Sequence, residues 1–249
     1  MSNIYNNLSN VYEMMYQTFI NYDEEYFFYA DILNEYNCRS LVELGCGTGS
    51  LASRFIKNGY NYTGLDLSNE MLARARRNNP MGSFVQGDMR NFQLAKKARV
   101  YIIAGRTISY LLSDEDVLNA FQSINANLDS SGIFCFDCID STKFIPLIRG
   151  SKKIHHTAEF NNRKFWRDSI WTVNNNHKHS FDWHSVFFEE KVNGQLQKLG
   201  EDFSVLRTFN KKEIIVFLNY NGFEVNEIID RPSYAFDTFV IVAEKKQID

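Results

Sequence analysis

The stretch Val42-Glu43-Leu44-Gly45-Cys46-Gly47-Thr48-Gly49 decides how this chain folds. The residues that lead into it, 40–44, are apolar except for Glu43, and they predict a buried strand. The residues after Gly49 repeat apolar side chains at the period of a helix. Between strand and helix, the three glycines permit positive φ and remove every Cβ, so that a ligand can approach the backbone. The N-terminus of the helix would present N–H groups to that ligand.

The spacing of the glycines indicates which ligand the turn would take. Dinucleotide-binding turns carry G-x-G-x-x-G, whereas Gly45, Gly47 and Gly49 form G-x-G-x-G. A carboxylate at Glu43 would also repel a phosphate, and it suits a ligand with an ammonium group. Taken alone, such a turn could also be a plain tight connection between strand and helix.

Two acidic residues follow at the ends of further predicted strands. In Gly64-Leu65-Asp66-Leu67-Ser68, Asp66 lies about 20 residues after the first glycine, where nucleotide-binding folds place the acid that binds ribose. In Val85-Gln86-Gly87-Asp88-Met89-Arg90-Asn91-Phe92, Asp88 follows the next predicted strand. Ligands of open α/β sheets bind along the edge at which such strands end. Asp66 could instead cap the next helix, for which Ser68 is the better candidate, and Asp88 could be a turn residue.

Together these segments resemble a known family. E-L-G-C-G-T-G is similar to the first motif of class I S-adenosylmethionine-dependent methyltransferases, and G-D-M-R-x-F at residues 87–92 is similar to their third-strand motif. The resemblance implies an α/β fold with a Rossmann-like seven-stranded sheet that a closing antiparallel hairpin completes. It implies S-adenosyl-L-methionine as the cofactor and S-adenosyl-L-homocysteine as its product. The implied cofactor contacts are Glu43, Gly45, Cys46, Gly47, Thr48, Gly49, Asp66, Leu67, Met71, Asp88, Met89 and Ala104.

The order of predicted elements agrees with that fold. Strands near 40–45, 62–67, 83–88, 99–105 and 132–138 alternate with helices near 49–58, 69–79 and 114–128, which is typical of a parallel sheet. Between 150 and 208 the helical period is lost, and turns at Asn174-Asn175-Asn176 and Asn193-Gly194 predict a three-stranded antiparallel insert. A helix at 211–221 and two strands then close the sheet. We therefore expect a core of residues 1–149 and 209–249, with an N-terminal helical lid, and an insert of residues 150–208 that roofs the acceptor pocket.

The segment after the fourth strand, Ala104-Gly105-Arg106-Thr107-Ile108-Ser109-Tyr110-Leu111, bears on the methyl acceptor. It lacks the prolines that amino-DNA methyltransferases carry there, and it resembles the S-S-x-x-Y-L of small-molecule methyltransferases, particularly N,N-dimethyltransferases of nucleotide-linked amino sugars. Asn10-Val11-Tyr12-Glu13 resembles the Y-D start of that group. Arg106, where a small residue is usual, and Glu13, in place of aspartate, depart from the pattern. The implied function is methyl transfer to a small-molecule amine or hydroxyl by in-line displacement.

The candidate catalytic residues are Tyr12, Tyr110 and Arg106. Each has a structural alternative, because the tyrosines could pack in the core and Arg106 could pair with an acid at the sheet edge. His184 is a further candidate for the wall of the site, although a solvated strand histidine explains it as well.

Two other classes of function stay open. The chain could be a non-catalytic adenosyl-binding partner protein, or it could transfer another group from an adenosyl cofactor, such as aminopropyl. Enzymes of the second kind typically carry a paired acid motif after strand four, and Gly105-Arg106-Thr107 offers none.

Composition limits the partners. The 249 residues carry a net charge of −3, the pI is about 6.0, and no basic block appears, which disfavours nucleic acid. The sequence shows no signal peptide and no apolar run of about 18 residues, so no membrane partner is expected. Cys135 and Cys138 form a C-x-x-C within an apolar strand, where residues three apart face opposite sides, so we expect no metal site. With Cys38 and Cys46 they predict reduced thiols in the cytoplasm.

The insert carries aromatic residues at period two, Phe181, Trp183 and Phe187. They form more apolar surface than a small sheet can bury alone. Because large apolar patches mark interfaces, we expect a homodimer contact here. The alternative is that this face packs wholly against the core of its own chain.

Overall fold

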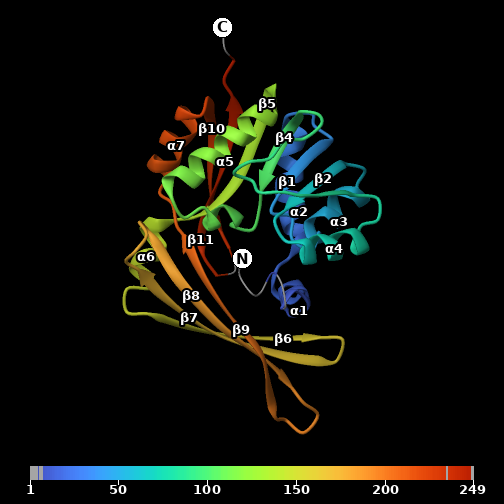
Figure 1. Cartoon of the computed structure of the whole chain (residues 1–249), viewed down its shortest axis with the longest axis vertical. Helices are drawn as coiled ribbons and strands as arrows, with labels where there is room; N and C mark the ends of the chain where they lie inside the picture. The colour runs from blue at the N-terminus through green and yellow to red at the C-terminus, as the bar shows by residue number, and fades with distance from the viewer. Residues whose placement is uncertain (1–4, 6–7, 234, 248–249) are drawn as a thin grey trace.

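The computed structural model describes residues 5, 8–233 and 235–247, and it contains two sheets (Figure 1). The seven-stranded sheet is built from β1 Ser40–Leu44, β2 Asn61–Asp66, β3 Ser83–Gln86, β4 Ala98–Ile103, β5 Leu128–Ile139, β10 Phe223–Pro232 and β11 Asp237–Lys245. The four-stranded sheet is built from β6 Lys152–Phe160, β7 Arg163–Asn174, β8 Ser180–Glu190 and β9 Leu196–Arg207. The helices are α1 Ser9–Phe19, α2 Tyr22–Glu35, α3 Ser50–Lys57, α4 Asn69–Asn78, α5 Asp114–Asn127, α6 Ser141–Leu147 and α7 Lys211–Tyr220, with a short 3-10 helix, η2 Thr107–Tyr110.

The larger sheet has the predicted topology. Its order is β10-β11-β5-β4-β1-β2-β3; the strands from β1 to β5 run parallel, and β11 is antiparallel to both of its neighbours. The order reverses between β1 and β4, which leaves a crevice at their carboxyl ends. The predicted Rossmann-like sheet with its closing antiparallel hairpin is confirmed.

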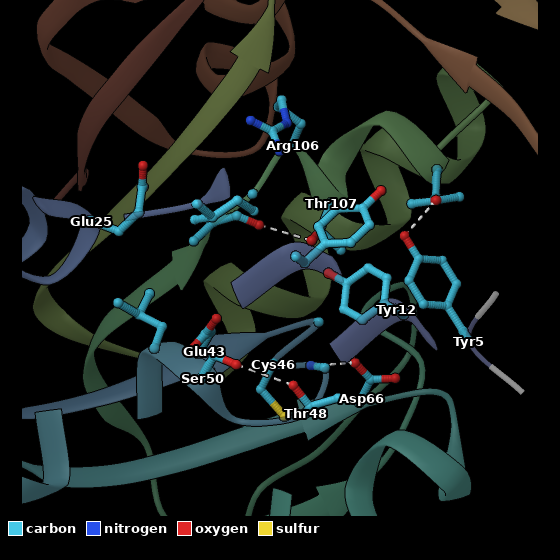
Figure 2. A pocket seen from close by; sticks show the side chains of 18 of the residues that line it. Tyr5, Tyr12, Glu25, Glu43, Cys46, Thr48, Ser50, Asp66, Arg106 and Thr107 are labelled. Atoms are coloured by element: carbon cyan, nitrogen blue, oxygen red, sulfur yellow. Dashed lines mark hydrogen bonds between the residues drawn. The ribbon is translucent and has the colours of Figure 1, made fainter. Parts of the chain in front are cut away.

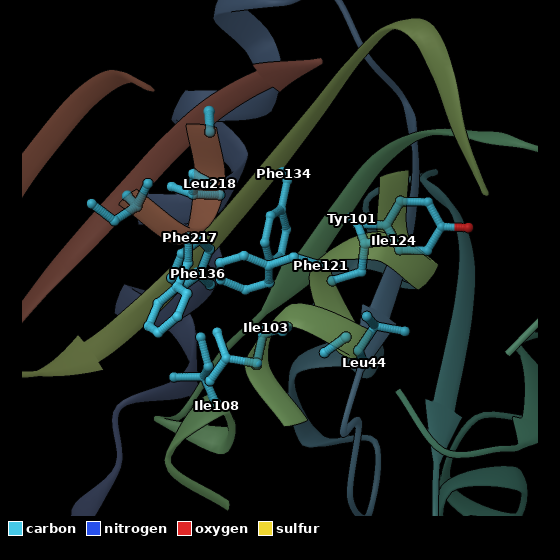
Figure 3. Packing of buried hydrophobic residues seen from close by; sticks show 14 of the residues in the cluster. Leu44, Tyr101, Ile103, Ile108, Phe121, Ile124, Phe134, Phe136, Phe217 and Leu218 are labelled. Atoms are coloured by element: carbon cyan, nitrogen blue, oxygen red, sulfur yellow. The ribbon is translucent and has the colours of Figure 1, made fainter. Parts of the chain in front are cut away.

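Helices cover both faces of this sheet because its strands alternate their side chains. Tyr101 and Ile103 of β4 pack in the core with α5 and α7, part of which Figure 3 shows. Val100 and Ile102, one residue out of phase, pack in the opposite core with α2, α3 and α4. Within the described residues, no helix is long and apolar enough to span a membrane.

The same alternation places the two cysteines of the C-x-x-C on opposite faces of the sheet. Cys135 packs in one core and Cys138 in the other, on opposite faces of β5. All four cysteines are free and buried. The expectation that both cysteines of the C-x-x-C belong to the core is confirmed.

The insert has four strands, not the three that we expected. The missed strand, β6, pairs with β7 through a two-residue turn at Asn161 and Asn162, whose φ angles are 51° and 59°. Two consecutive left-handed residues are typical of a tight hairpin, and asparagine tolerates them well. The predicted turns after Asn174 and at Asn193-Gly194 are confirmed.

The aromatic face of the insert is covered by its own chain. Phe165 and Phe187 are 0% exposed and pack against α1, while Phe181 packs with Phe144 of α6 and with Phe236. Figure 1 shows α1 lying between the two sheets. The apolar surplus from which we inferred a homodimer contact is therefore absent, and that reason for a homodimer is wrong.

Candidate active site

A cavity of about 580 Å³ lies at the carboxyl ends of β1, β2 and β4. The glycine turn after β1 and the end of β2 line one side, η2 and residues 231–233 line another, and α1 and side chains of the insert complete the wall. Its volume is typical of a site for a cofactor together with a small substrate. Figure 2 shows the labelled side chains converging on this space from those elements.

The three glycines of the turn serve different purposes. Their φ angles are 77°, 54° and 76° at Gly45, Gly47 and Gly49. A Cβ at Gly45 would lie 2.3 Å from Thr107 Cγ2, and one at Gly49 would meet Asn79 of the α4 connection at 2.6 Å. A Cβ at Gly47 would meet nothing within 4 Å. Gly47 therefore leaves open space on the cavity side, whereas Gly49 serves packing and does not line the cavity, contrary to our prediction.

Glu43 is a buried carboxyl group beside this turn. It is 5% exposed, lines the cavity and accepts a hydrogen bond from the Tyr62 hydroxyl. Burial raises its pKa to about 7. Among the described residues no lysine or arginine forms an ion pair with it. Because a buried carboxylate is costly without a cationic partner, this position favours a ligand that brings an ammonium group.

Asp66 is oriented by the same turn. One carboxylate oxygen, Oδ2, accepts from the Gly47 N–H at 2.8 Å, and Oδ1 accepts from the Ser68 N–H at 2.8 Å. Burial raises the pKa of Asp66, and these backbone donors oppose that shift. Ser68, not Asp66, caps α4, since its Oγ accepts from the Met71 N–H at 3.2 Å. Asp66 thus lines the cavity in a fixed orientation with lone pairs available to ligand hydroxyls.

Asp88 also lines the cavity, and its carboxylate accepts hydrogen bonds from Arg90, a residue to which our sequence reasoning gave no role. Arg90 donates from Nε to Oδ1 at 3.0 Å and from Nη2 to Oδ2 at 2.6 Å, and it reaches Asp116 on α5 as well. This guanidinium holds the pKa of Asp88 below its usual range. An adenine amino group would therefore share the carboxylate with Arg90.

The tyrosine side of the cavity contains both predicted tyrosines. Tyr12 stacks on Tyr16 with ring centroids 4.0 Å apart, and Tyr5 contacts Tyr12 and Tyr110 edge-on at 5.6 Å. The hydroxyls of Tyr5 and Tyr110 are 2.6 Å apart. Tyr5 and Tyr16 line the cavity as well, and sequence reasoning gave Tyr5 no role.

Arg106 links η2 to the end of the closing hairpin. Its backbone is left-handed, with φ at 63°, and its N–H donates to Asp137 Oδ1 at 2.7 Å. Its Nη1 donates to Ser233 Oγ at 2.5 Å, and its guanidinium lies 5.3 Å from the Phe236 ring centre. Burial raises the pKa of Asp137 to about 6, and the charge of Arg106 opposes that shift. The contact with Ser233, 127 residues away, could not be predicted from the sequence.

The remaining predicted site residues fall into those that line the cavity and those that do not. Six line the cavity as expected: Cys46, Thr48, Leu67, Met89, Ala104 and Gly45. Met71 is not among the residues that line the cavity, and it is buried, with 1% of its surface exposed. His184 is 44% exposed beside Glu201, outside the cavity, so that the solvated-histidine alternative is confirmed.

The predicted lid is attached to the core at two places. Glu13 of α1 accepts from Arg74 at 2.9 Å and from Asn78 at 2.7 Å, both on α4. The backbone carbonyl of Tyr5 accepts from Ser68 Oγ at 2.7 Å. Residues 1–4 and 6–7 of the lid lie outside the described residues.

These features fit the cofactor that the motifs imply. Glu43 would hold the ammonium group of S-adenosylmethionine, the backbone at Gly47 would lie against it, and Asp66 would accept from its ribose hydroxyls. Asp88 and Met89 of the G-D-M-R motif also line the cavity, where Asp88 would accept from the adenine amino group and Met89 would cover the ring.

Known proteins resemble this chain in sequence and in fold. A family model described as a methyltransferase domain matches residues 41–132. A Streptomyces venezuelae protein, dTDP-3-amino-3,4,6-trideoxy-alpha-D-glucopyranose N,N-dimethyltransferase, is 34% identical over 94 residues, which are 38% of this chain and 40% of that protein. The chain thus spans less than half the length of the first curated relatives that it matches.

Two solved structures cover nearly the whole chain. The structure of S-adenosylmethionine-bound CalS10, an amino pentose methyltransferase from Micromonospora echinaspora, has a TM-score of 0.78 at 20% identity and covers 91% of this chain and 92% of its own. A methyltransferase structure from Clostridium acetobutylicum has a TM-score of 0.78 at 16% identity and covers 98% and 100%. These likenesses show the fold, and the family model shows a methyltransferase domain at residues 41–132. The chain thus contains a methyltransferase domain and has the fold of S-adenosylmethionine-dependent methyltransferases.

Proposed function

We propose that this enzyme methylates the amino group of a nucleotide-linked amino sugar. The sequence relative from Streptomyces venezuelae is named for such a sugar, and CalS10 is described as an amino pentose methyltransferase. The short S-S-x-x-Y-L-like segment at 104–111 and the antiparallel insert support the same substrate class.

One observation carries the proposal: a single cavity runs from the glycine turn to the tyrosines beneath the insert. The turn side holds Glu43 and Asp66, which suit the cofactor. The other side holds Tyr12 and Tyr110, with Trp183 of the insert on the wall. An acceptor bound between the tyrosines and the turn would lie next to the cofactor and away from bulk water.

The protein itself has to supply little of the chemistry of methyl transfer. The cofactor, when bound, supplies a methyl group on an activated sulfonium. The protein must hold the acceptor in line with that group and exclude water. Burial raises the pKa of Tyr5 and of Tyr110, so that both hydroxyls stay protonated and orient the acceptor through hydrogen bonds without charge. Arg106, held by Ser233, would contact an anionic part of the substrate.

The compartment is part of the proposal. All four cysteines are free and buried, which supports a reducing compartment, and we place the enzyme in the cytoplasm.

The direct test is turnover. The purified protein would be incubated with S-adenosylmethionine and a panel of dTDP-linked amino sugars, their deaminated counterparts and simple amines, followed by mass spectrometry of methylated product and S-adenosylhomocysteine. We expect products heavier by one or two methyl groups only from the amino sugars. Methylation of the deaminated sugars would identify a hydroxyl acceptor, and binding of cofactor without methylation of any compound would favour the non-catalytic alternative.

A further inference from the structure

Arg167 is a buried cation on the inner face of the insert. It lies within β7, opposite His156 of β6 and Phe187 of β8, and is 1% exposed. Its Nη1 donates to the Tyr16 hydroxyl at 2.9 Å, and its Nη2 donates to His156 Nδ1 at 2.9 Å. A neutral side chain could donate the same hydrogen bonds without the cost of burying a charge. The charge of Arg167 therefore calls for a reason other than packing.

Three aromatic rings separate this charge from the cavity. The guanidinium carbon lies 5.4 Å from the ring centres of Tyr16 and Phe19 on α1 and of Trp183 on β8. All three residues line the cavity. On the same side Tyr16 stacks on Tyr12, one of the candidate catalytic residues. Arg167 thus places a positive charge directly behind the aromatic wall against which an acceptor would bind.

Charged and titratable groups on the elements around Arg167 determine how far its charge reaches: His156 and Lys152 on β6, Glu13 on α1, Glu189 on β8 and Asp202 on β9. His156 is neutral near pH 7, because burial and the guanidinium lower its pKa to about 4. Glu13 is bound by an arginine of α4 and Glu189 by an arginine of β7. Asp202, which is 6% exposed, would weaken the field of Arg167, whereas Lys152 would add to it. Removing Arg167 makes the cavity wall less positive in either case.

A positive charge at this place acts on an amine acceptor. Methyl transfer uses the lone pair of the nitrogen, so that only the unprotonated amine can attack the methyl group. A nearby cation disfavours the protonated form and lowers the pKa of the amine. An amine in contact with the far side of these rings would lie about 9 Å from the guanidinium, which at an effective dielectric constant of about 20 changes its pKa by about one.

We propose that Arg167 keeps the acceptor amine in its neutral, nucleophilic form. It acts through the field of its charge, from behind the wall, and does not touch the acceptor. The proposal rests on the proposed function in one respect, because it needs an amine as the acceptor, but it applies to any amine that binds against this wall.

The test is the pH dependence of methyl transfer in the bound complex. Single-turnover rates, with cofactor and acceptor both bound, fall at low pH as the amine is protonated, and the midpoint of that fall reports the pKa of the bound amine. We expect Arg167→Met to raise the midpoint by about one pH unit. Arg167→Lys, which keeps the charge, should keep the wild-type midpoint even if its plateau rate is lower. Lys164→Met, which removes an exposed cation from the outer face of the same strand, is the matched control and should leave the midpoint in place.

The midpoint separates an electrostatic role from a structural one. Arg167→Gln is a second neutral variant that can still donate to Tyr16, and binding of S-adenosylhomocysteine shows that each variant is folded. A lower plateau with an unchanged midpoint in Arg167→Met or Arg167→Gln would show a merely structural role and overturn the proposal. The same rise in Arg167→Lys would overturn it as well.

The acceptor panel separates this proposal from the proposed function. A wild type that methylates simple amines but no amino sugar would contradict the proposed function, while the midpoints measured with the simple amine still decide the role of Arg167. A wild type that methylates only hydroxyl groups would overturn both.

Discussion

Replacing Glu43 by glutamine tests two effects of its buried carboxylate: the loss of folding stability and the gain in affinity for the cofactor. Burial raises the pKa of Glu43 to about 7 from an ordinary 4.5. At about 1.4 kcal/mol for each tenfold change in proton affinity, ionising this group costs the folded state about 3 kcal/mol. The corresponding stability is fully present below pH 4.5 and is lost as the pH rises through 7. Glu43→Gln, which stays neutral, should therefore raise the free energy of unfolding by about 3 kcal/mol at pH 8 and by less than about 1 kcal/mol at pH 5.

Cofactor binding should respond in the opposite sense. An ammonium group binds the ionised carboxylate, and with a pKa near 7 about one tenth of Glu43 is ionised at pH 6 and about nine tenths at pH 8. The affinity for S-adenosylhomocysteine should therefore rise about tenfold between these pH values. Glu43→Gln should bind it more weakly by about 1.5–3 kcal/mol at pH 8 and show little of this pH dependence.

Two measurements check this reasoning: urea unfolding at pH 5 and pH 8, and calorimetric titration with S-adenosylhomocysteine at pH 6, 7 and 8. Tyr62→Phe is the matched control. The Tyr62 hydroxyl lowers the pKa of Glu43, so its removal should move the midpoint of the binding profile to higher pH. A wild-type affinity that is the same at pH 6 and pH 8, or a full pH slope retained in Glu43→Gln, would refute the role of Glu43.

Three further predictions concern other parts of the molecule. Asp66→Ala should weaken S-adenosylhomocysteine binding by about 1.5–3 kcal/mol, measured by calorimetry, and unchanged affinity would remove Asp66 from the site. Deletion of residues 1–20 should abolish transfer while the larger sheet still unfolds cooperatively; normal turnover of the truncated chain would exclude a lid. Arg207→Met should lower the free energy of unfolding, measured in urea, by about 3 kcal/mol, because the buried guanidinium contacts Glu213 at 2.9 Å. This value is the low end for a broken buried ion pair, since Lys178 still contacts Glu213 in the variant. A loss under about 1 kcal/mol would show that the ion pair contributes little to stability.

Local sequence patterns were sufficient for the larger sheet. The alternation of apolar strands and amphipathic helices predicted its parallel strands within two residues at most ends, because the period of side chains is set by the backbone conformation itself. The largest difference is in β5, which begins at Leu128, four residues earlier than expected. The glycine turn and Asp66 were also found from sequence, since the turn needs positive φ and the acid lies at the next strand end.

The insert shows where local patterns fail. The Asn161-Asn162 hairpin carries a turn signal, but its flanking strands mix polar and apolar residues, and β6 went unrecognised. Its aromatic residues were correctly predicted to share a face. What covers Phe187 and Phe181, however, depends on α1 and α6, which come from distant parts of the chain.

The sequence by itself determined the fold class, the glycine turn and the resemblance to methyltransferases, because each depends on residues that are neighbours along the chain. The tertiary structure alone decided how these groups behave. The pKa of Glu43 depends on its burial beside Tyr62, the hydrogen bonds of Asp88 depend on Arg90, and the position of the Arg106 guanidinium depends on Ser233, 127 residues away. Such properties arise from desolvation and from contacts between distant residues, and both exist only once the chain has folded.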